Sequence, residues 1–326
     1  MIDNHSTFTE PMLPTMKPTT AATDFQTAAE VALPALAHAS GCRCALHARR
    51  RLGGALIGGG ALAALGAAGP AAAQDAECQR SQFAKVVSAD QIEQAADQQY
   101  RQMLQEASTQ RALGPANHVQ VQRLRYIAQR IIPFTATCND RARQWRWEVN
   151  LIGSKDINAF CMPGGKIAFY HGILAQLQLD DDEVAMIMGH EIAHALLEHA
   201  RERMGKTVAT RGLLELGSAL LGLGNIGNTV VNMGGQLLTL RFSRDDESEA
   251  DALGLVLAAR AGYKPAAGVS LWRKMMDVSK GAPPQFLSTH PSGDSRTRDI
   301  ESRLPRVDPI YRAAAKPDRR FSPPSA

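Results

Sequence analysis

Five residues near the middle of the chain, His190-Glu191-Ile192-Ala193-His194, form the pattern HExxH and could bind and use a metal ion. Residues four apart lie one turn above each other on a helix face, so both imidazoles can reach the same ion. Glu191 then lies beside the metal, where it can take the proton of a zinc-bound water. The pattern predicts zinc-dependent hydrolysis with Glu191 as the general base.

Such a short pattern arises by chance in about one chain in a hundred of this length, and the alternative is a surface helix with two solvated histidines. Zinc in hydrolases usually takes a third protein ligand, and the acidic segment 243–251 places Glu247 53 residues beyond His194. Glu247 and Asp251 lie four apart and share a helix face. One can bind the metal while Asp251 holds a ligand histidine by its other nitrogen. Alone, such a stretch is more often a solvated face.

The HExxH residues need a helix to position them, and the sequence predicts one from about residue 180 to residue 204. Asp180 with Glu183 three positions on forms a capping-box start. His199 follows His194 by five residues, about 140° around the same helix, so we expect it to be structural and not a ligand.

Hydrophobic periodicity predicts the remaining elements. Alternation predicts a strand over 145–152, and a Pro-Gly-Gly turn predicts a strand–turn–strand unit over 158–170. The apolar segment 212–240 carries Glu215 and several asparagines, so we expect two packed helices near the site and not a membrane span. Further helices are expected over residues 89–113, 117–131, 245–262 and 265–278.

The first 73 residues do not resemble a folded domain. Three arginines (49–51) precede an apolar run from Leu52 to about Gly69 and then the small residues Ala71–Ala73. This order is typical of a secretory signal peptide, and the twin arginine resembles a twin-arginine export signal. We therefore expect cleavage near Ala73 and a periplasmic location; the alternative is a transmembrane anchor.

Composition narrows the function classes. The net charge of +4 is mild and spread along the 326 residues, which argues against nucleic-acid binding. The five cysteines contain no CxxC pair, which argues against a cysteine zinc site. In an oxidising compartment one disulfide and one spare thiol are possible, and Cys78 with Cys138 is a guess. We expect Cys161 to be a buried small hydrophobe.

Four segments occur in one order along the chain: NAFCMPGGKI (158–167), MGHEIAHALLEH (188–199), SRDDESEAD (243–251) and THPSGDSR (289–296). Together they resemble the M48 peptidase family, specifically its exported bacterial branch of periplasmic quality-control proteases, over roughly residues 85–305. The resemblance implies one zinc ion per chain, with Glu191 as general base and Asp251 supporting the site. The implied ligands are His190, His194 and Glu247.

The same resemblance assigns roles to three further segments. His290 falls on the family's His-Pro motif, near the metal, where it stabilises the oxyanion or caps the metal at rest; the alternative is a loop histidine before a proline. Arg296 matches the arginine after that motif, with a salt bridge and a catalytic role both open. Asn158, Ala159 and Phe160 resemble the strand along the cleft, and an edge strand can bind a substrate's backbone as an added strand.

The predicted fold is α+β, a mainly helical zincin-like metalloprotease domain (74–310) with a small β-sheet beside the HExxH helix. It lies between the leader (1–73) and a flexible C-terminal tail (311–326). The predicted function is a zinc endopeptidase that cleaves misfolded or unassembled envelope proteins. The alternatives are a latent, chaperone-like periplasmic binding protein and a membrane-associated processing protease. The expected partners are unfolded proteins, without nucleic acid; peripheral membrane association and oligomeric state stay open.

Overall fold

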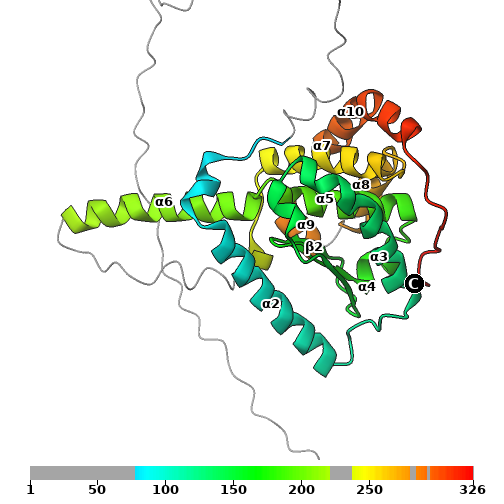
Figure 1. Ribbon diagram of the computed structural model, residues 1–326, viewed down its shortest axis with the longest axis horizontal. Coiled ribbons are helices and arrows are strands. Elements are labelled where there is room, and N and C mark those ends of the chain that lie inside the picture. Colours follow the sequence, from blue (N-terminus) through cyan, green and yellow to red (C-terminus); the bar gives the residue numbers. More distant parts are fainter. Residues whose placement is uncertain (1–77, 221–236, 280–283, 292–293, 326) are drawn as a thin grey trace, which may run out of the picture. The chain divides into compact units, whose positions relative to one another are not determined.

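The computed structural model describes residues 78–220, 237–279, 284–291 and 294–325 (Figure 1). The predicted leader (1–73) lies outside the described residues, all of which belong to the second of two compact units of the chain, residues 66–326. The described helices are α2 (Ala89–Thr109), α3 (Val119–Ile131), α4 (His171–Gln176), α5 (Asp181–Leu196), α6 (His199–Leu220), α7 (Arg244–Arg260), α8 (Ala267–Val278), α9 (Gln285–Thr289) and α10 (Asp294–Ala313). The 3-10 helices are η2 (Gln82–Val86), η3 (Ile132–Thr137) and η4 (Asp140–Arg143), and the strands are β1 (Glu148–Ile152), β2 (Ala159–Met162) and β3 (Lys166–Tyr170). The predicted mainly helical α+β fold is confirmed.

The sheet has the order β1-β3-β2, with β1 parallel and β2 antiparallel to β3. The turn between β2 and β3 contains Gly164 and Gly165 at φ 83° and 77°, a left-handed conformation that favours glycine. This confirms the predicted strand–turn–strand unit. Since β3 is central, β2 is an edge strand among the described residues.

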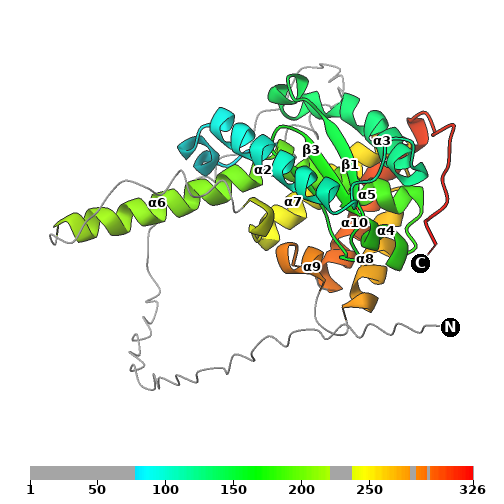
Figure 2. The same ribbon diagram turned by 90° about the horizontal axis from the view of Figure 1, so that it is seen from below.

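Alternate residues of the sheet face two different cores. Ile167 and Cys161 belong to the core that contains the apolar side of α5, whereas Ala168 and Phe160 belong to a second core with α2. The sheet therefore lies between α2 and α5 (Figure 2). This arrangement places the edge strand β2 directly beside the HExxH helix.

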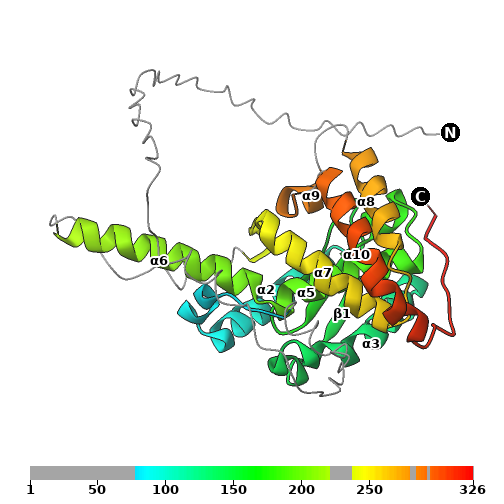
Figure 3. The same cartoon turned by 90° about the horizontal axis from the view of Figure 1, so that it is seen from above.

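Helix α5 lies at the centre of the domain, packed against α7 (Figures 1 and 3). Every α5 residue except Asp182 is buried, so the helix is not strongly amphipathic. The two backbones touch at a pair of glycines: a Cβ on Gly189 would come within 2.7 Å of the Gly254 oxygen. Small residues at this crossing let the two helices that carry the candidate metal ligands approach closely.

The helix predicted over 180–204 is interrupted, so the prediction is wrong in treating it as continuous. Residues 180–204 form two helices, because Glu198 adopts φ 61° and ends α5. The second helix, α6, starts at His199 and continues to Leu220; residues 221–236 of the predicted helix pair lie outside the described residues. Among the residues that are described, no helix has the length and apolarity needed to cross a membrane.

The C-terminal part holds structure that the sequence did not indicate. Helix α10 contains Pro305 and Pro309, residues that usually argue against a helix. Beyond it, the Phe321 backbone amide donates to Asp181 at 2.8 Å, and Arg320 pairs with Asp182 at 3.0 Å. The segment predicted to be a loose tail therefore begins inside α10 and then lies against the start of α5. The domain boundaries themselves stay predictions.

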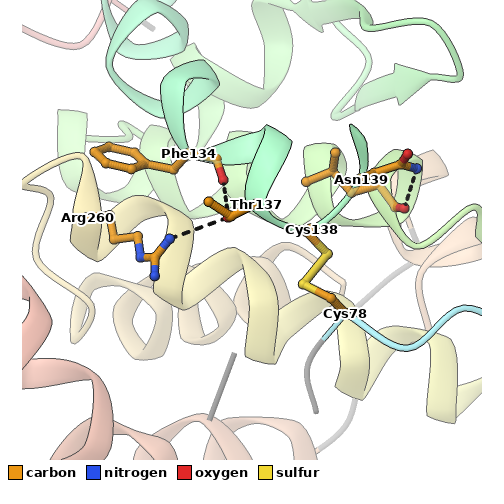
Figure 4. Close-up of a disulfide and its surroundings, with 7 residues drawn as sticks. Cys78, Phe134, Thr137, Cys138, Asn139 and Arg260 are labelled. Carbon is orange, nitrogen blue, oxygen red and sulfur yellow. Dashed lines mark hydrogen bonds between the residues drawn. A yellow bond between two sulfur atoms is a disulfide. The ribbon is translucent and has the colours of Figure 1, made fainter. Parts of the chain in front are cut away.

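A disulfide joins Cys78 to Cys138, which confirms the guessed pairing (Figure 4). Cys161 is a buried free thiol, as expected. The bond links residues 60 apart in sequence. It ties the start of the described chain to the end of η3. Closing a loop of this length removes about 4 kcal/mol of chain entropy from the unfolded state.

Candidate metal centre

Four buried side chains from three helices converge at one point. His190 and His194 come from α5, Glu247 from the first turn of α7, and His290 from the C-terminal end of α9. One donor atom from each lies within 4.8 Å of the others. All four residues are at most 4% exposed.

The donor set fits a zinc ion. Ligands at 2.0–2.1 Å from a tetrahedral zinc lie about 3.3 Å apart. The Nε2 atoms of His190 and His194 are 3.0 Å apart, and the Glu247 carboxylate lies 3.5 Å and 3.4 Å from these two nitrogens. Burial holds the pKa of His194 well below its usual value, which keeps the ring neutral as metal binding requires.

Both ligand-bearing helices have capped starts. Asp180 and Glu183 form the predicted capping box of α5, and Ser243 and Asp246 form a second box at α7. Each box satisfies two backbone amides that a helix start would otherwise leave without partners. The second box was not predicted, although it fixes the turn from which Glu247 projects.

A buried ionic network contacts the Nδ1 atom of His190, the ring nitrogen that faces away from the other candidate donors. The His190 Nδ1 lies 2.9 Å from Asp251 Oδ1, which leaves its Nε2 directed at the centre. Arg296 donates to Asp251 at 2.6 Å and also to Glu247. Burial alone would raise the pKa of Asp251, but Arg296 and His190 hold it below its usual value. The structure thus places both predicted supporting residues next to candidate ligands.

His194 is held by a different group. Its Nδ1 lies 2.8 Å from Nδ1 of His199, whose Nε2 lies 3.3 Å from Glu249 Oε2. The helical-wheel argument missed this contact because the break at Glu198 turns His199 back toward His194. The sequence did contain one indication of this contact, namely a histidine, His199, shortly after the HExxH pattern.

Glu191 is buried beside the four candidate donors. Its Oε1 has no hydrogen-bond partner among the described residues and lies 3.6 Å from Nε2 of His290. Burial raises the pKa of this carboxyl to about 7. A buried polar atom without a partner is uncommon, and Glu191 lines the same small cavity as His194 and His290. This position suits a general base.

Aromatic side chains that the sequence did not indicate enclose the centre. Phe242 stacks on His194 with ring centroids 4.0 Å apart, and Phe286 stacks on His290 at 4.6 Å. The guanidinium of Arg296 lies 3.5 Å from the ring centroid of Trp272. These rings fix the orientation of charged and metal-binding groups, but in sequence they resemble ordinary core residues.

The predicted substrate strand borders the centre. Asn158 directly precedes β2, while Ala159 and Phe160 lie within it. A small cavity of about 50 Å³ is lined by this strand, by Glu191 and His290, and also by Leu237, Leu238 and Leu240. The Phe160 side chain packs edge-on against Tyr100 with centroids 6.4 Å apart. The Phe160 side chain therefore belongs to the core beside α2.

Comparison with known proteins gives a consistent family. Residues 119–304, more than half of the chain, match the family model "Peptidase family M48". The "Mitochondrial metalloendopeptidase OMA1" of Schizosaccharomyces pombe is 37% identical over 166 residues, 50% of this chain and 48% of that protein. The Arabidopsis thaliana protein of the same name is 38% identical over 152 residues, 47% of this chain and 30% of its own. The "Metalloprotease LoiP" of Escherichia coli is 27% identical over 205 residues, 62% of this chain and 78% of that protein.

These comparisons correct one prediction. The periplasmic location is wrong, because relatives from Schizosaccharomyces pombe, Arabidopsis thaliana, Saccharomyces cerevisiae and Bos taurus are named as mitochondrial. The export signal rested on composition in residues 49–73, where arginine followed by small and apolar residues does not specify one compartment. The chain spans about half or less of the length of the OMA1 proteins from Schizosaccharomyces pombe and Arabidopsis thaliana.

Proposed function

The chain belongs to peptidase family M48, and from this premise we propose that it is a zinc-dependent endopeptidase acting on unfolded proteins. His190, His194 and Glu247 hold one zinc ion per chain in this proposal, and Glu191 is the general base. The observation that carries it is the convergence of these donors beside the unpartnered oxygen of Glu191. Metalloendopeptidase relatives support the same activity.

A bound zinc ion would supply Lewis-acid chemistry, acidifying water and polarising the substrate carbonyl. Glu191 accepts a proton from the attacking water and later delivers it to the leaving amine. His290, with Nε2 3.6 Å from Glu191, donates a hydrogen bond to the oxyanion that develops on the carbonyl. Asp251 with Arg296, and His199 with Glu249, keep the two ligand histidines oriented.

The substrate class follows from β2. Its outer edge can pair with an extended polypeptide through backbone hydrogen bonds, which depend little on side-chain sequence. A folded substrate would first have to release a segment of this kind, so we propose that unfolded or misfolded proteins are cleaved. Asn158, Ala159 and Phe160 provide the strand in this proposal. The envelope origin of the substrates depended on the periplasmic location and is not part of it.

A second candidate is a latent, zinc-bound binding protein. His290 Nδ1 lies 2.9 Å from Glu247, close enough to join the ligand set, and Phe242 covers His194. If His290 completes the coordination at rest, water and substrate are excluded until it moves. This candidate uses the same residues as the endopeptidase proposal. It differs only in how often His290 leaves the ligand set and admits water and substrate.

Casein cleavage by the purified chain separates the two candidates. The endopeptidase proposal expects cleavage that a chelator abolishes, zinc restores and Glu191→Gln removes. In that case His290→Ala lowers the rate, because it removes an oxyanion donor. The latent candidate expects little cleavage by the wild type and a gain with His290→Ala. Cleavage that survives Glu191→Gln would contradict both.

A further inference from the structure

A second group of side chains that can bind a metal ion lies beside the candidate metal centre. His199 and Glu202 come from the first turn of α6, and Asp246 comes from the first turn of α7. One donor atom from each residue lies within 4.8 Å of the others. The starts of the two helices lie side by side in the domain (Figures 1 and 3). None of these three residues is a ligand in the proposed catalytic site.

All three residues of this second group are buried. His199 is 1% exposed, Asp246 is 4% exposed and Glu202 is 9% exposed. Taking a charged side chain out of water is costly, so buried carboxylates are usually paired with a cation or coordinate a metal. The group therefore differs from an exposed acidic cluster, whose charges water can satisfy.

The two carboxylates have few cationic partners. Glu202 pairs through Oε1 with Lys206 at 2.5 Å, and 41% of that lysine side chain is exposed. Asp246 accepts the Ser243 backbone amide through Oδ2 in the capping box, and no described lysine or arginine forms an ion pair with it. A divalent cation would supply the charge that this part of the structure lacks.

The donor set has the chemistry of a transition-metal site. One imidazole with two carboxylates suits zinc and other first-row divalent cations. The lysine pair uses Oε1 of Glu202 and the capping bond uses Oδ2 of Asp246, so each carboxylate keeps a second oxygen for an ion. Ligands of one zinc ion lie roughly 3.3 Å apart, and small side-chain rotations bring the three donors to that spacing.

His199 also supports His194, and this second role connects the two ion sites. In the proposed catalytic site His194 binds zinc through Nε2, so its Nδ1 carries a proton and donates to Nδ1 of His199 at 2.8 Å. The neutral His199 ring then has its own proton on Nε2, which donates to Glu249. A ring in this state has no free nitrogen lone pair for a second ion.

A second ion must therefore break the contact between the two histidines, whichever nitrogen of His199 it takes. If the ion binds Nδ1, His194 loses its acceptor directly. If the ion binds Nε2, the ring carries its proton on Nδ1, and two donors then face each other across 2.8 Å. In both cases His194 loses the group that orients it, which weakens binding of the catalytic ion.

We propose that His199, Glu202 and Asp246 form a second, inhibitory site for a divalent transition-metal ion. An ion there compensates the two carboxylates and withdraws His199 from His194, so the two ions bind with negative coupling. Thermodynamic linkage requires each ion to weaken the other by the same factor. The inhibition rests on the proposed function, whereas the existence of the second site does not.

Equilibrium dialysis of the full-length chain against increasing free zinc tests the site. We expect the wild type to bind one ion tightly and a second ion more weakly. Glu202→Gln removes one of three ligands and should weaken the second step at least about tenfold, because loss of a supporting residue alone has that effect. The other histidines of the chain are common to both proteins, so the difference between them reports this site.

Glu198→Gln is the matched control for this substitution. It also removes a carboxylate that pairs with a basic side chain of α6, since Glu198 lies 2.8 Å from Arg201, but it is not part of the second group. It should leave the second step unchanged. Asp246→Asn is a second test variant, because the amide oxygen keeps the acceptor of the capping box while the charge is lost. Thermal unfolding in chelator shows which variants are folded.

Casein cleavage at rising zinc concentration tests the inhibition. In the wild type and Glu198→Gln, cleavage should rise as the catalytic ion binds and then fall over the range in which the second ion binds. In Glu202→Gln it should rise equally and then stay constant over that range. An equal fall in the wild type and Glu202→Gln would show that excess zinc inhibits by another route.

Glu247→Ala separates this proposal from the proposed function. The variant lacks a ligand of the catalytic ion, so His194 competes less for His199, and the second ion should bind more tightly than in the wild type. Dialysis gives this result even if the chain cleaves nothing. Three results overturn the proposal: saturation of the wild type at one zinc ion, an equally strong second step in Glu202→Gln, and a second step that Glu247→Ala leaves unchanged.

Discussion

The two candidate ligand histidines lie one turn apart on the same helix, yet they are supported in different ways. His190 is held by Asp251 and Arg296, which are both buried. His194 is held by His199, which in turn reaches Glu249, a carboxylate with 55% of its side chain exposed. One support is a closed ionic network in the core, and the other leads to solvent.

The two supports should contribute unequally to the stability of the fold. Removing one member of a buried ion pair leaves a charge without compensation, whereas an exposed pair is screened by water. We therefore expect the two halves to respond unequally to equivalent substitutions. The His190 half controls both folding and metal binding, and the His194 half controls mainly the metal.

The largest effect is expected from Asp251→Ala. It leaves Arg296 buried with only Glu247 as a carboxylate partner, and the cost is about 3 kcal/mol of folding free energy. Zinc affinity falls about 10- to 100-fold as well, because His190 loses its orienting partner. Denaturant unfolding in chelator and zinc titration measure the two effects. Asp245→Ala, exposed in the first turn of α7, is the control, and equal stabilities of the two variants would contradict the account.

A smaller loss of folding free energy is expected from Gly189→Ala, which changes the packing of α5 against α7 and so affects both ligand histidines. The added Cβ would lie 2.7 Å from the Gly254 oxygen, so α5 and α7 must separate. Overpacking of this kind costs about 1–3 kcal/mol. Thermal unfolding should show a lower midpoint, and zinc affinity should fall with it. Gly268→Ala is the matched control, because its added Cβ meets the nearest atom at 3.4 Å, in ordinary contact.

His199→Ala should affect the metal more than the fold. His194 loses the group that orients its Nδ1, and zinc affinity falls about tenfold, at the lower end of the range for supporting residues. His199→Asn offers a shorter polar partner and should recover part of the affinity. If alanine and asparagine weaken zinc binding equally, the contact with His194 is only packing.

The smallest effect is expected from Glu249→Gln. The exposed carboxylate contributes at most about 1 kcal/mol, so zinc affinity changes less than about fivefold. The effect should shrink further in high salt, because exposed charges are screened. A loss as large as that of Asp251→Ala would show that both supports work in the same way.

The sequence predicted the parts of the centre that follow short-range rules. Spacing within α5 identified His190, Glu191 and His194, and the acidic segment identified Glu247 and Asp251. His290 needed the family resemblance, because it lies 43 residues beyond Glu247, directly after the short helix α9, which has no periodic signal. Two prolines concealed α10, although its first turns carry Arg296.

The contacts that were missed depend on backbone geometry and packing. The left-handed residue Glu198 decides where His199 lies, and glutamate gives no indication of that conformation. In the sequence, Phe242 and Trp272 look like ordinary aromatic core residues. Only the folded chain shows that Phe242 lies against His194 and Trp272 against Arg296. Local sequence fixes helices and their spacing, whereas such long-range contacts depend on the complete fold.

We propose that Glu247 completes the metal site with the two HExxH histidines. The most direct test is the zinc content of the purified chain, measured by atomic spectroscopy for the wild type, Glu247→Ala and the control Asp245→Ala. We expect about one zinc per chain in the wild type and the control, and almost none in Glu247→Ala. A full complement of zinc in Glu247→Ala, or none in the wild type, would contradict it.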